Sequence, residues 1–206
     1  MKDYQKQTID TYNAHAQAFD DSRAACQQSE RLLEFIQEVP GKKVLDLGCG
    51  PGRDLVHFVE KGFVVTGIDL SNAFVALAKQ KVPQATVVEG DILDLPFDGD
   101  SFDGVWASAS LVHFKKEDCF RALQEIYRVL VLSGIAYISI KEGQGEEIVT
   151  DPSLGDALRF FSYYTEDELC DMAREVGFTV ISRSQKESQR TGALKKVNWV
   201  VLFLRK

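Results

Sequence analysis

Hydrophobic positions along the chain follow two periods, one typical of buried strands and the other of amphipathic helices. Short apolar runs predict seven strands, at about 43–47, 63–71, 85–89, 101–108, 134–141, 178–183 and 196–204. Helical spacing predicts helices at about 53–61, 72–81, 117–130 and 166–175. Strands that alternate with helices indicate an α/β fold with a mainly parallel sheet, which the last two strands close as a hairpin.

Two segments lie outside this alternation. Residues 1–39 have helical spacing in two stretches, and Tyr12 and Phe19 lie on the apolar stripe of the first. Residues 142–164 are rich in glycine and acidic residues and then in aromatic residues, so we expect the least regular part of the chain there. A length of 206 residues favours a single domain with one substantial core.

A glycine-rich turn follows the first strand. The apolar run 43–47 stops at three glycines in five positions, Gly48, Gly50 and Gly52, and a helical pattern restarts at Arg53. A strand that feeds such a turn into a helix is the corner at which α/β sheets bind nucleotides. Glycine suits this place because it adopts a positive φ without strain and lets the backbone approach a ligand closely.

The residues around this turn bear on the kind of ligand. A dinucleotide fingerprint would have its third glycine at the position of Arg53. Asp46 lies two residues before the first glycine, where a carboxylate would repel a pyrophosphate and attract a cationic ligand such as an ammonium or a sulfonium. Asp69 ends the second strand and can accept hydrogen bonds from ribose hydroxyls, as it would in an NAD site as well. A dinucleotide site and an ordinary glycine-rich turn therefore remain alternatives at this point.

Four motifs in order carry a family resemblance that spans about residues 8–183. The pattern D-x-G-x-G-x-G at 46–52 closely resembles motif I of the class I S-adenosylmethionine (SAM)-dependent methyltransferases. Residues 90–97 resemble the family segment G-D-[AIL]-x-x-L-P-F, residues 101–108 resemble the start of motif IV, and residues 109–114 resemble its S-x-x-x-x-H-[FL] loop. The chain is similar to the small-molecule, ubiquinone-biosynthesis-like subgroup. It departs from the usual L-x-P-G-G turn, with Leu132 and Ile135 in place of the proline and the second glycine.

This resemblance implies a fold and a cofactor site. The fold is a Rossmann-like three-layer sandwich whose seven-stranded, mostly parallel sheet has an antiparallel last strand, in a single domain over residues 1–206. The cofactor is SAM, which becomes S-adenosylhomocysteine, and no metal is expected. The resemblance assigns the methionine end to Asp46, Gly48, Gly50 and the Ser108 carbonyl. It assigns the ribose and adenine to Asp69, Leu70, Asp91 and Ile92, and Tyr12 lies in a segment that folds over the methionine end.

The same resemblance describes the acceptor side. It implies in-line displacement of a methyl group, with residues 1–40 as a helical cap and residues 142–164 as a substrate lid. We expect His113 to act as a general base or to order its loop, because a histidine titrates near neutral pH. His113, Lys141, Arg159 and Tyr163 are candidate substrate-binding residues. Either Arg159 or Lys141 is expected to meet an acidic group, and a lid packed on the core with Arg159 in solvent is the alternative.

Motifs that are absent narrow the choice of acceptor. No N/D-P-P-Y motif follows directly on the fourth strand, which argues against methylation of adenine amino groups or glutamine amides. The loop at its end has no cysteine, flanking glutamate pair or carboxylate at 107–109, which argues against cytosine-C5, arginine and magnesium-dependent catechol methylation. A small molecule remains as the acceptor, with a protein or RNA group as the alternative. A non-catalytic SAM-binding protein, a dinucleotide-dependent oxidoreductase and an aminopropyl transferase are the other functions to consider.

Composition adds limits on partners and location. The net charge of −7 argues against broad electrostatic binding to nucleic acid or to an anionic membrane. Four scattered cysteines and three histidines have no metal-ligand spacing. No apolar run has the ~18 residues of a membrane span, and the polar start lacks a signal peptide, so we expect a cytoplasmic protein. The sequence leaves a monomer and a homodimer equally open.

Overall fold

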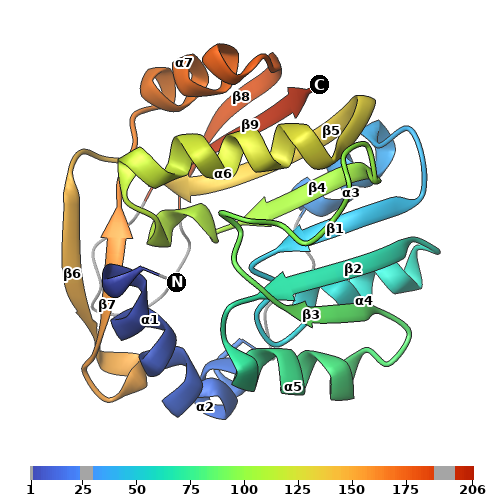
Figure 1. Cartoon of the computed structure of the whole chain (residues 1–206). Helices are drawn as coiled ribbons and strands as arrows, with labels where there is room; N and C mark the ends of the chain where they lie inside the picture. Colours follow the sequence, from blue (N-terminus) through green and yellow to red (C-terminus); the bar gives the residue numbers. More distant parts are fainter. Residues whose placement is uncertain (1, 24–29, 188–197) are drawn as a thin grey trace.

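A seven-stranded sheet organises the computed structural model, which describes residues 2–23, 30–187 and 198–206 (Figure 1). Its strand order is β3-β2-β1-β4-β5-β9-β8. The strands are β1 (Lys43–Leu47), β2 (Val64–Asp69), β3 (Thr86–Glu89), β4 (Phe102–Ser108), β5 (Leu130–Lys141), β8 (Thr179–Glu187) and β9 (Asn198–Arg205). The last strand, β9, runs antiparallel to both β5 and β8, whereas β1 to β5 are parallel. The predicted α/β fold with an antiparallel last strand is confirmed.

Helices cover both faces of this sheet (Figure 1). One buried cluster joins β1 and β4 to α3 (Glu30–Glu38), α4 (Arg53–Glu60) and α5 (Asn72–Lys81). A second cluster joins the opposite face to α6 (Lys116–Val129) and α7 (Glu166–Val176). Alternation along β1 divides its side chains between the two layers: Val44 packs in the first cluster, and Leu45 and Leu47 pack in the second. Asp46 therefore points toward the layer that contains α4.

Helix starts and strand ends agree closely with the sequence prediction. Ser71 caps α5 by accepting a hydrogen bond from Phe74 N, and Thr165 caps α7 by accepting one from Glu168 N. As predicted, no helix lies between β3 and β4 among the described residues, and the chain crosses through turns over residues 90–101. The fifth strand is longer than predicted and begins at Leu130, directly after α6.

The segment 142–164 is more regular than its sequence predicts. It forms a two-stranded antiparallel sheet from β6 (Glu146–Asp151) and β7 (Ala157–Ser162), joined through the short helix η2 (Pro152–Leu154). The N-terminal helix α1 (Asp3–Ala14) runs along β7, and α2 (Ala16–Asp21) continues it toward α5 (Figure 1). The predicted helical segment and the predicted lid segment thus lie side by side.

Side chains of α1 bind the hairpin on one side and the main domain on the other. Thr8 Oγ1 accepts a hydrogen bond from Phe160 N at 2.9 Å, and Thr11 Oγ1 donates one to the Leu158 carbonyl at 2.8 Å. Asn13 Oδ1 accepts hydrogen bonds from Ser71 Oγ at 2.7 Å and from Ala73 N at 3.3 Å, at the start of α5. Helix α1 therefore bridges β7 and α5.

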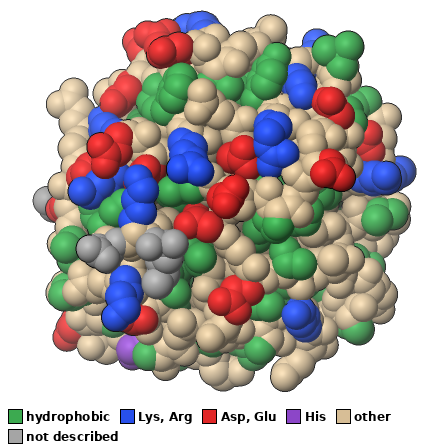
Figure 2. All heavy atoms as spheres, in the orientation of Figure 1, with side chains coloured by type: hydrophobic (Ala, Val, Ile, Leu, Met, Phe, Trp, Pro, Cys, Tyr) green, Lys and Arg blue, Asp and Glu red, His purple; other side chains and the backbone are tan. Residues whose placement is uncertain are grey.

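Charged side chains of both signs are interspersed over the face shown in Figure 2, without a large area of one sign. Apolar side chains lie between them in small groups. Among the residues that the structure describes, no helix combines the length and the hydrophobicity that a bilayer crossing requires.

Candidate functional site

The glycine turn between β1 and α4 has the backbone conformation that its sequence predicts. Gly48, Gly50 and Gly52 have φ angles of +69°, +53° and +87°, in the left-handed region that favours glycine. A Cβ atom added to Gly48 would lie 2.5 Å from Ser110 Cβ, so the chain passes closely there. A Cβ atom added to Gly50 would meet no atom within 4 Å. The turn is therefore packed at its first glycine and open at its second.

Asp46 is a buried acid beside this turn. Its side chain is 3% exposed, and its Oδ2 atom has no hydrogen-bond partner among the described residues. Burial raises the pKa of this carboxyl well above its usual range, and the nearby Asp54 carboxylate raises it further. A buried carboxylate oxygen without a donor is costly, and a cationic donor at this position would relieve that cost.

Asp54 itself is engaged by the protein. Its Oδ2 accepts a hydrogen bond from Trp106 Nε1 at 2.8 Å, and its Oδ1 accepts one from Arg53 Nε at 2.7 Å. These bonds hold the Asp54 carboxylate in the layer beneath the turn. Asp46 is thus the acid of this pair that has a free oxygen.

Asp69 is fixed against the turn from the neighbouring strand. Its Oδ2 accepts a hydrogen bond from Gly50 N at 2.9 Å, and its Oδ1 accepts one from Ser71 N at 2.8 Å. Burial raises the pKa of this carboxyl to about 6, although the backbone N–H groups of Ser71, Gly50 and Leu70 oppose the shift. Each carboxylate oxygen can accept a further hydrogen bond, and the half-buried Leu70 follows directly in the chain.

The remaining predicted cofactor residues follow neighbouring strand ends. Asp91 and Ile92 lie two and three residues beyond β3, and Asp91 Oδ1 accepts a hydrogen bond from Leu93 N at 3.0 Å. Ser108 ends β4, and Ala109 then turns with a φ of +59° and donates its N–H to the Ser139 carbonyl at 3.1 Å. Because β3, β2, β1 and β4 are adjacent and parallel, these groups lie along one edge of the sheet.

His113 ends the short helix η1 (Leu111–His113), which follows β4. Its Nδ1 lies 2.8 Å from the Phe160 carbonyl oxygen, which can only accept, so Nδ1 carries the proton. Its Nε2 therefore accepts, and the Tyr12 hydroxyl donates to it at 2.8 Å. Burial, together with the positive charges of Arg159 and Lys141, lowers the pKa of His113 to about 3. The imidazole is a neutral ring with a defined tautomer.

The hydrogen bonds continue from Tyr12 into the hairpin. Arg159 Nη1 donates to the Tyr12 hydroxyl oxygen at 3.0 Å, and Arg159 Nη2 pairs with the Asp151 carboxylate. The side chains of Arg159 and Asp151 are only 10% and 4% exposed. The chain therefore gives Arg159 an internal acidic partner, whereas its sequence suggested an acidic group of a substrate.

The other two candidate substrate residues lie on the same hairpin or next to it. Lys141 Nζ lies 3.4 Å from the centroid of the Phe161 ring, and the Arg159 guanidinium carbon lies 4.9 Å from the same centroid. The Tyr163 hydroxyl donates to Glu147 Oε1 at 2.6 Å in an exposed position. The structure thus groups Lys141 and Arg159 around one ring, with Tyr163 at the periphery.

Sequence reasoning missed two members of these networks, Asp151 and Asn13. The register of the hairpin pairs Val149 with Arg159, which places Asp151 two residues along on the same face. A correct prediction of this hairpin and its register would have indicated that Asp151 and Arg159 are neighbours. No comparable signal marks Asn13, because its partners lie on α5, about sixty residues away in the chain.

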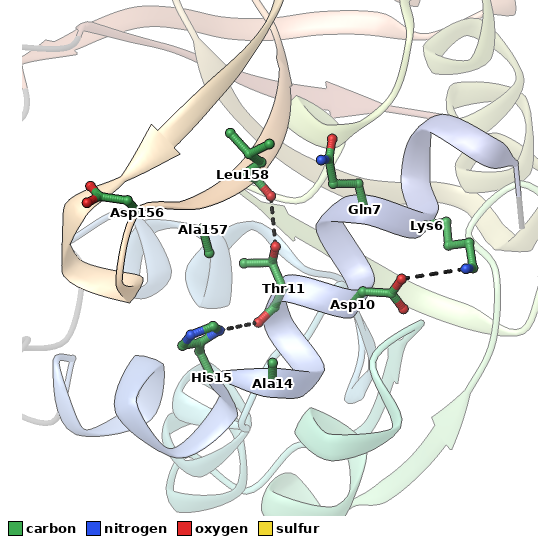
Figure 3. A pocket seen from close by; sticks show the side chains of 9 residues that line it. All are labelled: Lys6, Gln7, Asp10, Thr11, Ala14, His15, Asp156, Ala157 and Leu158. Atoms are coloured by element: carbon green, nitrogen blue, oxygen red, sulfur yellow. Dashed lines mark hydrogen bonds and ion pairs between the residues drawn. The ribbon is translucent and has the colours of Figure 1, made fainter.

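A surface cavity of about 620 Å³ lies elsewhere, between α1 and the start of β7 (Figure 3). Six residues of the N-terminal helices, among them Thr11 and His15, line it together with Asp156, Ala157 and Leu158. Within it, His15 Nδ1 donates to the Thr11 carbonyl and Thr11 Oγ1 donates to the Leu158 carbonyl. None of the predicted site residues lines this cavity, so the oriented polar groups around the glycine turn remain the candidate site.

Comparison with known proteins connects this geometry to a family. Residues 44–134 match the family model described as a methyltransferase domain. An uncharacterized methyltransferase of Synechocystis sp. is 40% identical over 103 residues, which make up 50% of this chain and 49% of that protein. A demethylmenaquinone methyltransferase of Chlorobaculum tepidum is 37% identical over 116 residues, or 55% of this chain and 46% of that protein. The chain spans about half the length of these curated relatives.

Solved structures agree in fold. A SAM-dependent methyltransferase of Methanosarcina mazei superposes with a TM-score of 0.77 at 23% identity, covering 87% of this chain and 98% of that one. The 1,6-didemethyltoxoflavin-N1-methyltransferase of Burkholderia thailandensis, solved with its substrate and S-adenosylhomocysteine, superposes with a TM-score of 0.73 at 22% identity. That alignment covers 100% of this chain and 91% of the other. At these identities the likeness concerns the fold alone.

Proposed function

We propose that this chain, a member of the class I SAM-dependent methyltransferase family, transfers a methyl group from SAM to a small-molecule acceptor. Relatives whose names state a small-molecule reaction, such as the demethylmenaquinone methyltransferase and a 24-methylenesterol C-methyltransferase of Arabidopsis thaliana, support a small acceptor. The observation that carries the proposal is the unpartnered Oδ2 of the buried Asp46, beside a turn whose second glycine is open.

The residues around the turn suit this cofactor. Asp46 offers a negative charge to a cationic group, and the bare backbone of Gly50 permits close approach. Asp69 is held in place by two backbone donors and keeps acceptor capacity for ribose hydroxyls. When bound, SAM supplies a methyl group on a positively charged sulfur. The protein contributes alignment and the exclusion of water.

The remaining predicted contacts are proposals of the same kind. We assign Leu70, Asp91 and Ile92 to the adenine end, and the Ser108 carbonyl and Tyr12 to the methionine end. Tyr12 comes from α1, so the cap would close over the cofactor only when α1 is in place. Its ring is 8% exposed and packs on Phe19 and Phe74 at centroid distances of 5.2 and 5.1 Å.

We place the acceptor between the helical cap, residues 1–40, and the lid, residues 142–164. His113, Lys141, Arg159 and Tyr163 all lie on or next to these segments. The continuous hydrogen bonds from Asp151 through Arg159 and Tyr12 to His113 tie the cap, the lid and the loop after β4 together. This tie supports a shared wall formed by the three segments.

Calorimetric titration tests the cofactor assignment. We expect S-adenosylhomocysteine to bind in the micromolar range and NADH not to bind. Asp46→Asn should weaken S-adenosylhomocysteine by about tenfold or more, since a charge-assisted contact contributes roughly 1.5–3 kcal/mol. Asp171→Asn is the control, because that side chain is 76% exposed on α7. Tight NADH binding, or no binding of S-adenosylhomocysteine to the wild-type protein, would refute the proposal.

A further inference from the structure

The immediate surroundings of His113 determine which proton it can move. Its Nδ1–H is used by the Phe160 carbonyl and its Nε2 is used by the Tyr12 hydroxyl, so neither ring nitrogen is free for a substrate proton. A base must hydrogen-bond to the proton that it abstracts, directly or through one water. In this arrangement, the imidazole orients the Tyr12 hydroxyl.

The charges around His113 act in the same direction. Arg159 from β7 and Lys141 from β5 both disfavour a positive charge on the ring, and Asp151 from β6 faces Arg159 instead of the imidazole. Tyr12 from α1 is neutral, because burial raises the pKa of its phenol. With a pKa lowered to about 3, the His113 ring is neutral at pH 7. Within the described part of the chain, the groups bonded to this ring are the Tyr12 hydroxyl and the Phe160 carbonyl, and neither is a carboxylate.

We propose that the methyl acceptor reacts as an anion, and that His113 is a positioning residue for Tyr12 instead of the base. This inference rests on the methyl transfer proposed above. A lone pair of the anion forms the new bond to the methyl carbon, and the electron pair of the broken carbon–sulfur bond stays on sulfur. Because the acceptor is already an anion, no proton has to be removed from it. The transfer cancels the negative charge of the acceptor and the positive charge of the sulfonium.

The structure favours such an acceptor on two further grounds. Lys141 Nζ and the Arg159 guanidinium both lie near the Phe161 ring and place positive charge beside His113, and the Asp151 carboxylate pairs with Arg159. A reaction that cancels two opposite charges gains from a site without water, where a reaction that creates charge would lose. Carboxylates, thiolates and acidic enols belong to this class of acceptor.

The first test is independent of turnover. Nitrogen-15 NMR of histidine-labelled protein reports the tautomer and the protonation state of His113, with His15 and His57 as internal references. We expect a neutral ring with the proton on Nδ1 down to about pH 5, and loss of the Nε2 hydrogen-bond shift in Tyr12→Phe. A second proton on His113 above about pH 6 would overturn the proposal.

The second test measures recognition of the anion. Benzoate and its uncharged isostere benzamide are titrated calorimetrically into the protein saturated with S-adenosylhomocysteine. We expect benzoate to bind at least about tenfold more tightly, with the preference lost in Lys141→Met and retained in Lys79→Met, whose lysine is exposed on α5. Equal binding of the two probes, or no binding of either, would count against the proposal.

These readouts separate the inference from the function on which it rests. S-adenosylhomocysteine is titrated before benzoate or benzamide is added. If it does not bind in that first titration, the cofactor assignment is refuted. The His113 spectrum can be recorded with or without that ligand. A neutral His113 in a protein that does not bind S-adenosylhomocysteine would refute the proposed function and the anionic acceptor that rests on it, and would leave His113 as a positioning residue for Tyr12.

Discussion

The buried ion pair between Arg159 and Asp151 allows a quantitative prediction. Replacing Asp151 by asparagine keeps the shape of the side chain and removes its charge, which leaves the Arg159 guanidinium buried with the Tyr12 hydroxyl as its other bonded neighbour. Breaking a buried pair from one side costs about 3–5 kcal/mol, because the remaining charge has neither water nor a counterion. With side chains 10% and 4% exposed, this pair is in the buried range.

The size of the effect can be checked by denaturation. For a chain of this length each kcal/mol lowers the melting temperature by about 2–4 °C, so Asp151→Asn should lower it by roughly 6–20 °C. Urea unfolding followed by circular dichroism gives the free energy directly. Asp171→Ala, which breaks an exposed pair with Arg174, should stay within about 1 kcal/mol of the wild type.

A double variant identifies the cause. Asp151→Asn combined with Arg159→Met removes both charges and keeps most of the buried volume, so it should be more stable than Asp151→Asn alone by at least about 1 kcal/mol. If the single variant lost less than about 1 kcal/mol, or if the two substitutions were additive, the uncompensated charge would not be the cause and this reasoning would be wrong.

Three further predictions concern the glycine turn, the Asp69 carboxyl and the N-cap of α7. Gly50→Ala should fold, lose about 1–2 kcal/mol of unfolding free energy because of its left-handed φ, and bind S-adenosylhomocysteine more weakly. Gly48→Ala should lose more stability, because its Cβ would overlap Ser110. Urea unfolding compares the stability of the two variants, and calorimetry compares their affinity. Affinity for S-adenosylhomocysteine should fall by up to about tenfold per pH unit below about pH 6 as Asp69 is protonated, and Asp69→Asn should bind weakly and without this pH dependence. The folded-state pKa of Asp69 exceeds the ordinary value of 3.8, so its ionisation should lower the free energy of unfolding as the pH rises from about 4 to about 6. Unfolding of the wild type and of Asp69→Asn across this range can measure the effect. Thr165→Ala should cost about 1 kcal/mol by removing the cap of α7 and leave cofactor affinity unchanged.

Local signals explain what the sequence predicts well. The strand β1, the turn at Gly48 and Gly50 and the start of α5 at Asn72 depend on residues within a few positions of one another, and the structure confirms each. The proximity of Asp69 to Gly50 also follows from the chain, because adjacent parallel strands end at the same edge. The fold could therefore be predicted together with the central part of the candidate site.

Contacts between distant segments explain what the sequence does not predict. The β6–β7 hairpin has no two-residue turn signal, because η2 and two further residues join its strands. Its register, and with it the Asp151–Arg159 pair, could therefore not be predicted from the sequence. The state of His113 depends on Tyr12, about a hundred residues earlier, and on Phe160, about fifty residues later. The motif places this histidine near the site, but its burial is set by α1 and β7.

The segment that departs from the L-x-P-G-G pattern lies within β5, which begins at Leu130, and its conformation has a local explanation as well. Ser133 adopts a φ of +65° in this segment. Ser133 N donates a hydrogen bond to the Lys206 carbonyl, and Lys206 N donates one to the Gly134 carbonyl. The backbone of Lys206 thus holds this segment at the opposite side of the sheet from Asp46. At this position Leu132 and Ile135 should have little effect on function.

The threonines of α1 have a consequence for how the protein tolerates truncation. Thr8 and Thr11 supply the hydrogen bonds that a neighbouring strand would otherwise give to Phe160 N and the Leu158 carbonyl. Removal of residues before Asn13 would leave this side of β7 with unpaired backbone groups, next to exposed apolar side chains at Ile148 and Leu158. Such an edge pairs readily with another chain. The first helix should therefore keep the protein from self-associating into sheets, and a shortened chain should aggregate on storage even where its central sheet is intact.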